Sequence, residues 1–282
     1  MWSEDEIRGR LAISTALFQK VQLSETEIGA IKRAGIDRVE ISMVRKSFDD
    51  RDEAQVDRVL EACNKHDVEV VSVHGPFDLP YADKTEDGER AVIEGSVAPI
   101  GLAERAGAKH YVGHFGNDDR AHRIVETLVE RTEGMSVVLT TENQTGQPLK
   151  PYDDFATGIE SERAGWTLDI GHARDDDKVN PFVKSRAADT IQSQCANVNH
   201  THLHDSFDQK SRVDHWPPMH KDGIIRWIEV FEGLQAIGYG GHFIFEDGRG
   251  EDPDVWMEHA ATFPERFVER RLATENTEGH GG

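Results

Sequence analysis

The chain has 282 residues, enough to bury a sizeable core, and 37% of them are hydrophobic and 30% charged. Its formal net charge is -21, and a surface of that sign repels acidic membranes and nucleic-acid phosphates. No apolar run is long enough to span a bilayer, and the acidic start of the chain lacks the basic and apolar regions of a signal peptide. We therefore expect a cytoplasmic protein with no membrane contact, and nucleic acid is disfavoured as a partner.

The acidic residues are spread along the chain in short clusters: Glu4–Glu6, Asp49–Glu53, Asp175–Asp177 and Glu251–Asp254. We interpret them as an adaptation to high salt, where screening removes the repulsion between like charges. The alternative is an ordinary acidic cytoplasmic protein. Cys63 and Cys195 form no CxxC pair, and we expect two buried free thiols rather than a disulfide.

Short apolar runs rich in β-branched residues recur along the chain. Their length and the turn residues that flank them predict strands. In chain order, the predicted strands are Leu11–Thr15, Arg38–Ser42, Val68–His74, His110–His114, Val137–Glu142, Trp166–Ile170, Val198–Leu203 and His242–Glu246.

Amphipathic stretches separate these runs. Ser24 opens the first stretch with Glu27 three positions later, which is a capping-box pattern, and Gly35 ends it. Further helices are predicted over Asp52–His66, Glu86–Ala106, Arg120–Thr132, Asp153–Arg163, Arg186–Cys195, Asp222–Ile237 and Asp254–Arg271.

Strands alternating with helices in this way predict an α/β fold, a single (β/α)8 TIM barrel. A doubly wound open sheet is the alternative, and the lack of a Gly-rich phosphate loop after the first strand disfavours it. No repeat or linker divides the chain. We expect a catalytic barrel over residues 1–272 and a polar, Gly-rich, disordered tail over residues 273–282.

The reactive groups of such a barrel sit at the C-terminal ends of its strands. Six successive predicted strands have His, Asp or Glu at the last or second-last position: His74, His114, Glu142, Asp169, His202 and Glu246. Converging carboxylates raise one another's pKa unless a cation is present. Carboxylates with an imidazole suit Mn²⁺, Mg²⁺, Co²⁺ or Zn²⁺. We therefore predict one divalent cation bound by Glu142, Asp169, His202 and Glu246.

Other polar residues near the strand ends have two interpretations. His74 could cap a strand and turn, and His114 could be a satisfied core histidine. Asp205 and Asp247 could be metal ligands or hydrogen-bonding loop residues.

Strand alternation separates the histidines of the seventh strand from its apolar residues. His200, His202 and His204 share one face. We expect His200 and His110 to be structural, and His204 to support a metal ligand from behind.

The strand-end segments resemble the xylose-isomerase-like superfamily of sugar isomerases and epimerases, which also contains endonuclease IV. Their order and spacing extend the resemblance from about Leu11 to the last helix. The matching segments are Val73–Pro76, Gly113–Gly116, Thr141–Asn143, Leu168–Ala173, Thr201–Ser206 and Phe245–Asp247.

Resemblance to the sugar epimerases implies one divalent cation and a small sugar or hydroxy-keto substrate. Glu142 and Glu246 would be the catalytic pair, exchanging a proton through an enediolate. Arg212 would hold a distal oxygen of the substrate, unless it is a solvated surface residue. A homo-oligomer is also possible. The implied substrate-binding residues are His74, His114, His172 and Arg212.

Resemblance to endonuclease IV implies a trinuclear zinc cluster that cleaves DNA at abasic sites. The additional metal ligands would be His74, His114, His172, Asp214 and His215. That nuclease needs an Asp-x-His after the seventh strand, whereas Asp214 and His215 are adjacent here. The lack of an evident basic surface also disfavours DNA. A third alternative is a non-catalytic barrel that binds a metal or a sugar.

Overall fold

The computed structural model describes the chain except for residues 176, 184–185, 207–214, 247–251 and 279–282. Its parallel strands close into a barrel in chain order, with β8 paired to β1, which confirms the predicted TIM barrel. Each predicted strand is present, with ends that differ by at most two residues. The strands are β1 (Leu11–Ser14), β2 (Arg38–Ser42), β3 (Glu69–His74), β4 (His110–Gly113), β5 (Val138–Glu142), β6 (Ala164–Asp169), β7 (His200–Leu203) and β8 (Phe243–Phe245).

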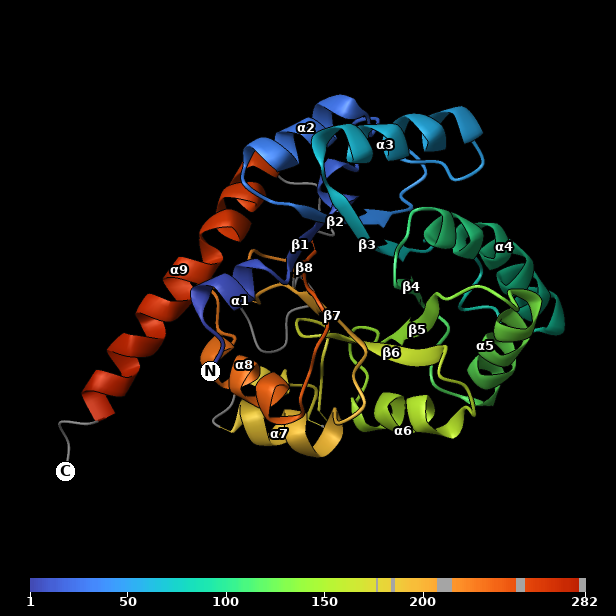
Figure 1. Cartoon of the computed structure of the whole chain (residues 1–282). Helices are drawn as coiled ribbons and strands as arrows, with labels where there is room; N and C mark the ends of the chain where they lie inside the picture. The colour runs from blue at the N-terminus through green and yellow to red at the C-terminus, as the bar shows by residue number, and fades with distance from the viewer. Residues whose placement is uncertain (176, 184–185, 207–214, 247–251, 279–282) are drawn as a thin grey trace.

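The helices surround the strands on the outside of the barrel, and α9 extends beyond its body (Figure 1). The α-helices are α1 (Glu4–Arg8), α2 (Glu25–Arg33), α3 (Glu53–His66), α4 (Glu86–Arg105), α5 (Asp119–Arg131), α6 (Lys150–Gly158), α7 (Ala187–Gln194), α8 (Trp227–Ala236) and α9 (Pro253–Glu278). Two short 3-10 helices are η1 (Thr15–Phe18) and η2 (Pro181–Val183).

The predicted capping box begins α2. The Ser24 hydroxyl accepts a hydrogen bond from the backbone of the first turn, and the Glu27 carboxylate accepts one from the Ser24 N–H at 2.9 Å. Gly35 has a φ of 83°, a left-handed conformation that costs glycine little and ends the helix. The local signals therefore set both ends of α2 as expected.

Helix α8 begins at Trp227 rather than at the predicted Asp222. The carboxylate of Asp205 accepts hydrogen bonds from the backbone N–H groups of Met219 and Ile225, both at 3.1 Å, and from the Trp227 indole at 2.8 Å. These bonds hold residues 219–225 as a loop. Asp205 is thus a hydrogen-bonding loop residue, one of its two predicted roles.

Two other helices differ from their predicted bounds. Helix α6 begins three residues early, with Pro151 in its first turn, where proline is tolerated, and ends before Ile159, which is extended. Helix α9 continues to Glu278, because no glycine or proline follows Arg271 before residue 279. Residues 273–278 are therefore helical where a disordered tail was expected.

Side chains of the strands alternate between the helix layer and the barrel interior. Outward residues join the main hydrophobic core, for example Ile41, Val73, Leu168 and Leu203. The interior is largely polar and buried, and it contains Glu40, Ser72, Thr140, Thr167 and His200. A polar interior places hydrogen-bonding groups directly beneath the strand ends.

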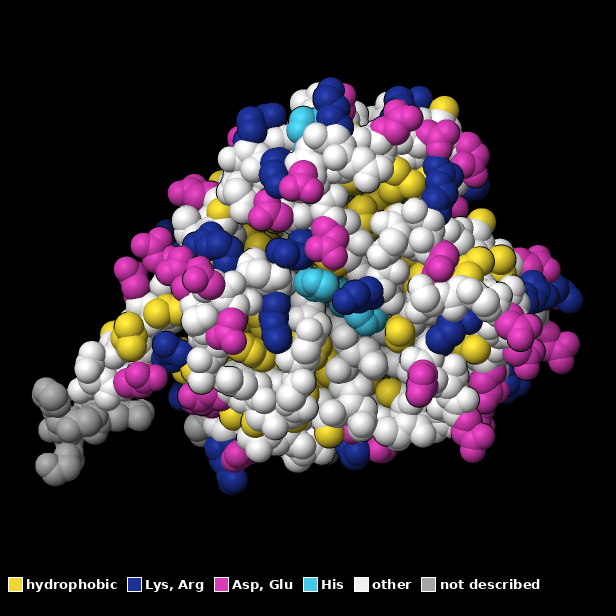
Figure 2. All heavy atoms as spheres, viewed as in Figure 1, with side chains coloured by type: hydrophobic (Ala, Val, Ile, Leu, Met, Phe, Trp, Pro, Cys, Tyr) yellow, Lys and Arg dark blue, Asp and Glu magenta, His cyan; other side chains and the backbone are white. Residues whose placement is uncertain are grey.

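Cys63 and Cys195 are buried and free, as predicted. None of the helices in the described part of the chain is long and apolar enough to cross a membrane. Acidic and basic side chains are both scattered over the face seen in Figure 2, without a single acidic block.

Candidate metal centre

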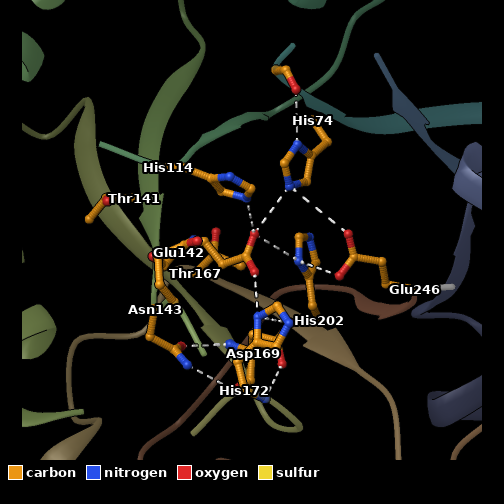
Figure 3. Close-up of polar contacts among 12 residues, drawn as sticks. His74, His114, Thr141, Glu142, Asn143, Thr167, Asp169, His172, His202 and Glu246 are labelled. Atoms are coloured by element: carbon orange, nitrogen blue, oxygen red, sulfur yellow. Dashed lines mark hydrogen bonds and ion pairs between the residues drawn. The ribbon is translucent and has the colours of Figure 1, made fainter. Parts of the chain in front are cut away.

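The four predicted ligands meet at one end of the barrel. Glu142 ends β5, Asp169 ends β6, His202 lies on β7 and Glu246 follows β8 directly. Their ligand atoms all lie within 4.8 Å of one another, and all four side chains are buried (Figure 3). Parallel strands present their C-terminal ends at the same rim, so residues more than 100 positions apart converge there.

His202 lies between the two glutamates (Figure 3). Its Nδ1 atom is 3.5 Å from Oε2 of Glu142 and 3.3 Å from Oε2 of Glu246. His74 faces the same pair, with Nε2 3.1 Å from Oε2 of Glu142 and 4.0 Å from Oε1 of Glu246. Each imidazole therefore directs one nitrogen at two carboxylates.

Hydrogen bonding shows that this space suits a cation. Nδ1 of His74 lies 3.1 Å from the carbonyl of Gly75, which can only accept, so a neutral His74 presents a lone pair at Nε2. Nδ1 of His202 and Oε2 of Glu246 are buried and make no hydrogen bond within the described residues. A lone pair facing carboxylate oxygens is unfavourable unless a proton or a metal ion lies between them. The donor set of carboxylates and imidazole fits a divalent cation.

Hydrogen bonds hold both the backbone and the side chain of Asp169. Its backbone N–H donates to Oδ1 of Asn143 at 2.8 Å, and the Asn143 amide donates to the Asp169 carbonyl at 3.0 Å. Its Oδ1 atom accepts the backbone N–H of His172 at 2.8 Å and lies 2.8 Å from Nε2 of His204. His204 thus lies directly behind Asp169, one of the predicted ligands.

The surrounding histidines keep the carboxylates ionised. Burial opposes ionisation, but hydrogen bonds from His114 and His172 help to hold the pKa of Glu142 well below its usual range. Burial likewise opposes the charge on Asp169, and His172 and His204 lower the pKa of that carboxyl. These groups are therefore ready to bind a cation at neutral pH.

The carboxylates in turn favour the charged form of His202. Burial favours the neutral imidazole, but the charges of Glu246, Glu40 and Glu142 raise its pKa well above the ordinary value. Without a metal ion, protons on the imidazoles balance the carboxylates. A divalent cation supplies the same positive charge.

His74, His114 and His172 all contact Glu142. Nε2 of His114 lies 3.3 Å from Oε2 of Glu142, and Nδ1 of His172 lies 3.1 Å from Oε1. The His215 ring stacks on His204 at 4.2 Å between centroids and meets His172 edge-on at 5.0 Å. The structure thus brings these predicted site residues together, whereas Arg212, Asp214 and Asp247 lie outside the described residues.

A cavity of about 300 Å³ opens above the predicted ligands. Phe77 stands at its edge, 43% exposed, with its ring stacked on His74 at 4.4 Å between centroids. The cavity is lined by Ala16, Gln19, Val44, Phe77, His114, Glu142, His172, His215 and Glu246. Its volume suits a small organic molecule that reaches both glutamates.

Glu40 is the site residue that sequence reasoning missed. It lies in the middle of β2, fully buried, and Nε2 of His202 and of His200 lie 3.2 and 3.3 Å from its Oε2 atom. Strands β2 and β7 are not neighbours in the barrel, so these contacts cross its interior. The sequence pattern that could have indicated it is the alternation of side chains along β2. Val39 and Ile41 face the helix layer, so Glu40 between them must face the barrel interior.

The fold and the site together define a TIM barrel with a buried cluster of carboxylates and histidines at the C-terminal ends of its strands. The family model described as the xylose isomerase-like TIM barrel matches residues 28–266, and the chain belongs to that family. The predicted resemblance is thereby confirmed. The chain is also 24% identical over 243 residues to the uncharacterized protein MJ1311 of Methanocaldococcus jannaschii, covering 77% of this chain and 78% of that protein.

Solved structures share the fold. An L-ribulose 3-epimerase superposes with a TM-score of 0.72 at 16% identity, covering 97% of this chain and 99% of the other. A D-tagatose 3-epimerase-like protein gives 0.70 at 20% identity, covering 95% and 99%. A 3-keto-D-glucoside 4-epimerase from E. coli gives 0.69 at 16% identity, covering 91% and 99%. At these identities, the likeness establishes the fold.

Proposed function

We propose that this protein is a divalent-metal-dependent isomerase or epimerase of a small sugar or hydroxy-keto compound. The observation that carries the proposal is the convergence of two buried glutamates, Glu142 and Glu246, on His202 at the floor of a small cavity. The named epimerases that share the fold support the choice of substrate class.

One divalent cation would be held by Glu142, Asp169, His202 and Glu246. When bound, it would polarise carbonyl and hydroxyl oxygens of the substrate and so acidify the neighbouring carbon. The cavity above the four residues gives the substrate access to both glutamates.

Glu142 and Glu246 would move the proton. One carboxylate takes it from the substrate carbon, which gives an enediolate, and the other returns a proton. His172, hydrogen-bonded to Glu142 at 3.1 Å, would orient a substrate hydroxyl. Phe77 at the cavity edge would cover an apolar face of the sugar ring.

The test is solvent deuterium exchange. Metal-loaded protein is incubated in D₂O with a panel of ketoses, and deuterium on carbon is followed by NMR. The proposal predicts that at least one ketose gains deuterium at the carbon next to its carbonyl. If no ketose exchanges while the metal is bound, the barrel that only binds a metal or a sugar is favoured instead.

One observation favours a second candidate, a metal-dependent phosphodiesterase acting on abasic DNA. Groups that could each hold an ion lie side by side and share Glu142 and Asp169. They are His74, His114 and Glu142; Glu142, Asp169, His202 and Glu246; and Asp169, His172, His204 and His215. Metal stoichiometry separates the candidates, because about one ion per chain supports the isomerase and about three the nuclease. Cleavage of an abasic oligonucleotide would support the nuclease directly.

A further inference from the structure

The interior of the barrel contains a carboxylate that faces the back of a predicted metal ligand. Oε2 of Glu40 accepts the Ser72 hydroxyl at 2.8 Å and lies 3.2 Å from Nε2 of His202 and 3.3 Å from Nε2 of His200. All four side chains are buried. An ionised carboxylate only accepts, so each imidazole must present an N–H at Nε2.

This contact decides which nitrogen of His202 faces the metal centre. With the proton on Nε2, the lone pair of a neutral His202 lies on Nδ1, which points at Glu142 and Glu246. The other tautomer would direct a lone pair at Glu40 inside the barrel, without water to relieve the repulsion.

We infer that Glu40 is a positioning residue for the metal centre: it fixes the tautomer and the ring orientation of His202 so that Nδ1 is presented to the cation. The inference rests on the proposed metal binding. Histidine ligands commonly donate their second N–H to a carboxylate in this way, which orients the ring and strengthens the ligand. Here the carboxylate comes from β2, on the other side of the barrel from His202.

The test measures Zn²⁺ affinity by chelator competition on the full-length protein, for the wild type and for Glu40→Gln and Glu40→Ala. Ser72→Ala is the matched control, since it removes another donor to the same oxygen without touching His202. We expect Glu40→Ala to weaken Zn²⁺ binding by about 10- to 100-fold. Glu40→Gln, which retains one acceptor oxygen, should lose less, and Ser72→Ala should bind like the wild type.

A second readout distinguishes the positioning of His202 by Glu40 from a contribution of Glu40 to fold stability alone. In the Zn²⁺-loaded wild type, ¹⁵N NMR should show a protonated Nε2 on His202, protected from exchange, and Glu40→Ala should lose that protection. If both Glu40 variants fold and bind Zn²⁺ as tightly as the wild type, the inference is wrong while the proposed function stands. A wild type that binds no divalent metal contradicts the proposed function itself.

A different observation concerns the substrate. A second cavity, of about 640 Å³, adjoins the one above the metal centre and shares Gln19, Val44 and Phe77 with it. Lys20 and Lys46 line this cavity, both exposed, and neither has an ion pair within the described residues. The cavity also contains Arg45, but its charge is balanced. Its Nε lies 2.7 Å from Oδ1 of Asp78, and its Nη1 lies 3.6 Å from Oδ1 of both Asp49 and Asp50.

Lys20 and Lys46 thus place two ammonium groups, without an ion pair among the described residues, beside the site of a chain whose net charge is -21. A neutral sugar needs no such charge, whereas a phosphate group gains a charge-assisted contact with each ammonium. We also propose that this cleft binds the phosphate of a small phosphorylated sugar. This proposal rests on the proposed function, whose substrate would then be a sugar phosphate.

The probe is inorganic phosphate, titrated into metal-free protein and followed by backbone amide NMR. Saturable shifts at the cleft are expected, and Lys20→Gln with Lys46→Gln should weaken them by about tenfold or more. Lys109→Gln is the matched control, because Lys109 precedes β4 and lies at the opposite end of the barrel. Shifts that do not saturate, or that persist in the double variant, contradict the proposal whether or not any sugar exchanges deuterium. Tighter binding of an abasic oligonucleotide than of a pentose 5-phosphate would overturn the assignment to a small substrate.

Discussion

The Nδ1 atom of His202 lies 3.3 Å from Oε2 of Glu246, and neither atom forms a hydrogen bond within the described part of the chain. Both atoms are buried, and both are strong ligands for a divalent cation. A proton or a metal ion between them removes the conflict. The function proposed above depends on which of the two occupies this position in the active protein.

Replacing Glu246 with Gln should abolish most proton exchange. The amide has nearly the shape of the carboxylate but cannot take up a proton, so the rate of deuterium incorporation should fall by about 10²- to 10⁴-fold. Metal content must be measured on the same sample, because Glu246 is also a predicted ligand. Glu126→Gln, exposed on α5, is the matched control. A fully active Glu246→Gln variant that retains its metal would exclude Glu246 as a proton carrier.

The stabilisation of the fold by a bound metal should increase with pH. The carboxylates around His202 and His172 raise the pKa of each imidazole against the effect of burial. In metal-free protein, their charged forms stabilise the fold fully below the unfolded pKa of about 6.5, and this contribution is lost as the pH rises through the raised folded-state values. A bound cation replaces those protons. The difference in Tm between metal-loaded and metal-free protein should therefore widen from about pH 6 to about pH 9; a difference that narrows would contradict the assignment.

Removing the Asp205 carboxylate should destabilise the loop before α8 without affecting the metal centre. Asp205 is buried and accepts hydrogen bonds from Met219, Ile225 and Trp227. We expect Asp205→Ala to lower the free energy of unfolding by about 2–4 kcal/mol, measured by chemical denaturation. Asp205→Asn retains one acceptor and should lose less. A normal stability combined with lost Zn²⁺ affinity would instead make Asp205 a ligand.

High salt should stabilise the protein. The net charge is -21, and its acidic side chains repel one another most strongly in the compact folded state. Multimolar salt screens this repulsion beyond a few ångströms. Thermal unfolding in low salt and in multimolar KCl should therefore give a clearly higher Tm in the second. Equal Tm values would point to an ordinary acidic protein.

The strands and the convergence of the four predicted ligands could be predicted from the sequence because both depend on local pattern. Apolar β-branched runs predict strands, and parallel strands must bring their final residues to one rim. Glu142, Asp169, His202 and Glu246 could therefore be expected to meet before any coordinates were known.

The residues that the sequence did not indicate depend on contacts between distant segments. Glu40 contacts His202 across the barrel, and nothing near β2 in the sequence indicates that partner. The predicted start of α8 is wrong, although apolar residues occur there at helical spacing. Asp205 accepts hydrogen bonds from the backbone of Met219 and Ile225, and these bonds hold residues 219–225 as a loop. Tertiary hydrogen bonds outweighed local propensity there.

The most direct test of the metal centre is the metal content of the purified protein after equilibration with Mn²⁺ or Zn²⁺ and removal of unbound ions. The wild type should retain about one ion per chain, and His202→Ala should retain far less, since a ligand of a metal site cannot be removed without loss of affinity. Three ions per chain would contradict the mononuclear centre in favour of the nuclease, and a wild type that retains none would contradict the account as a whole.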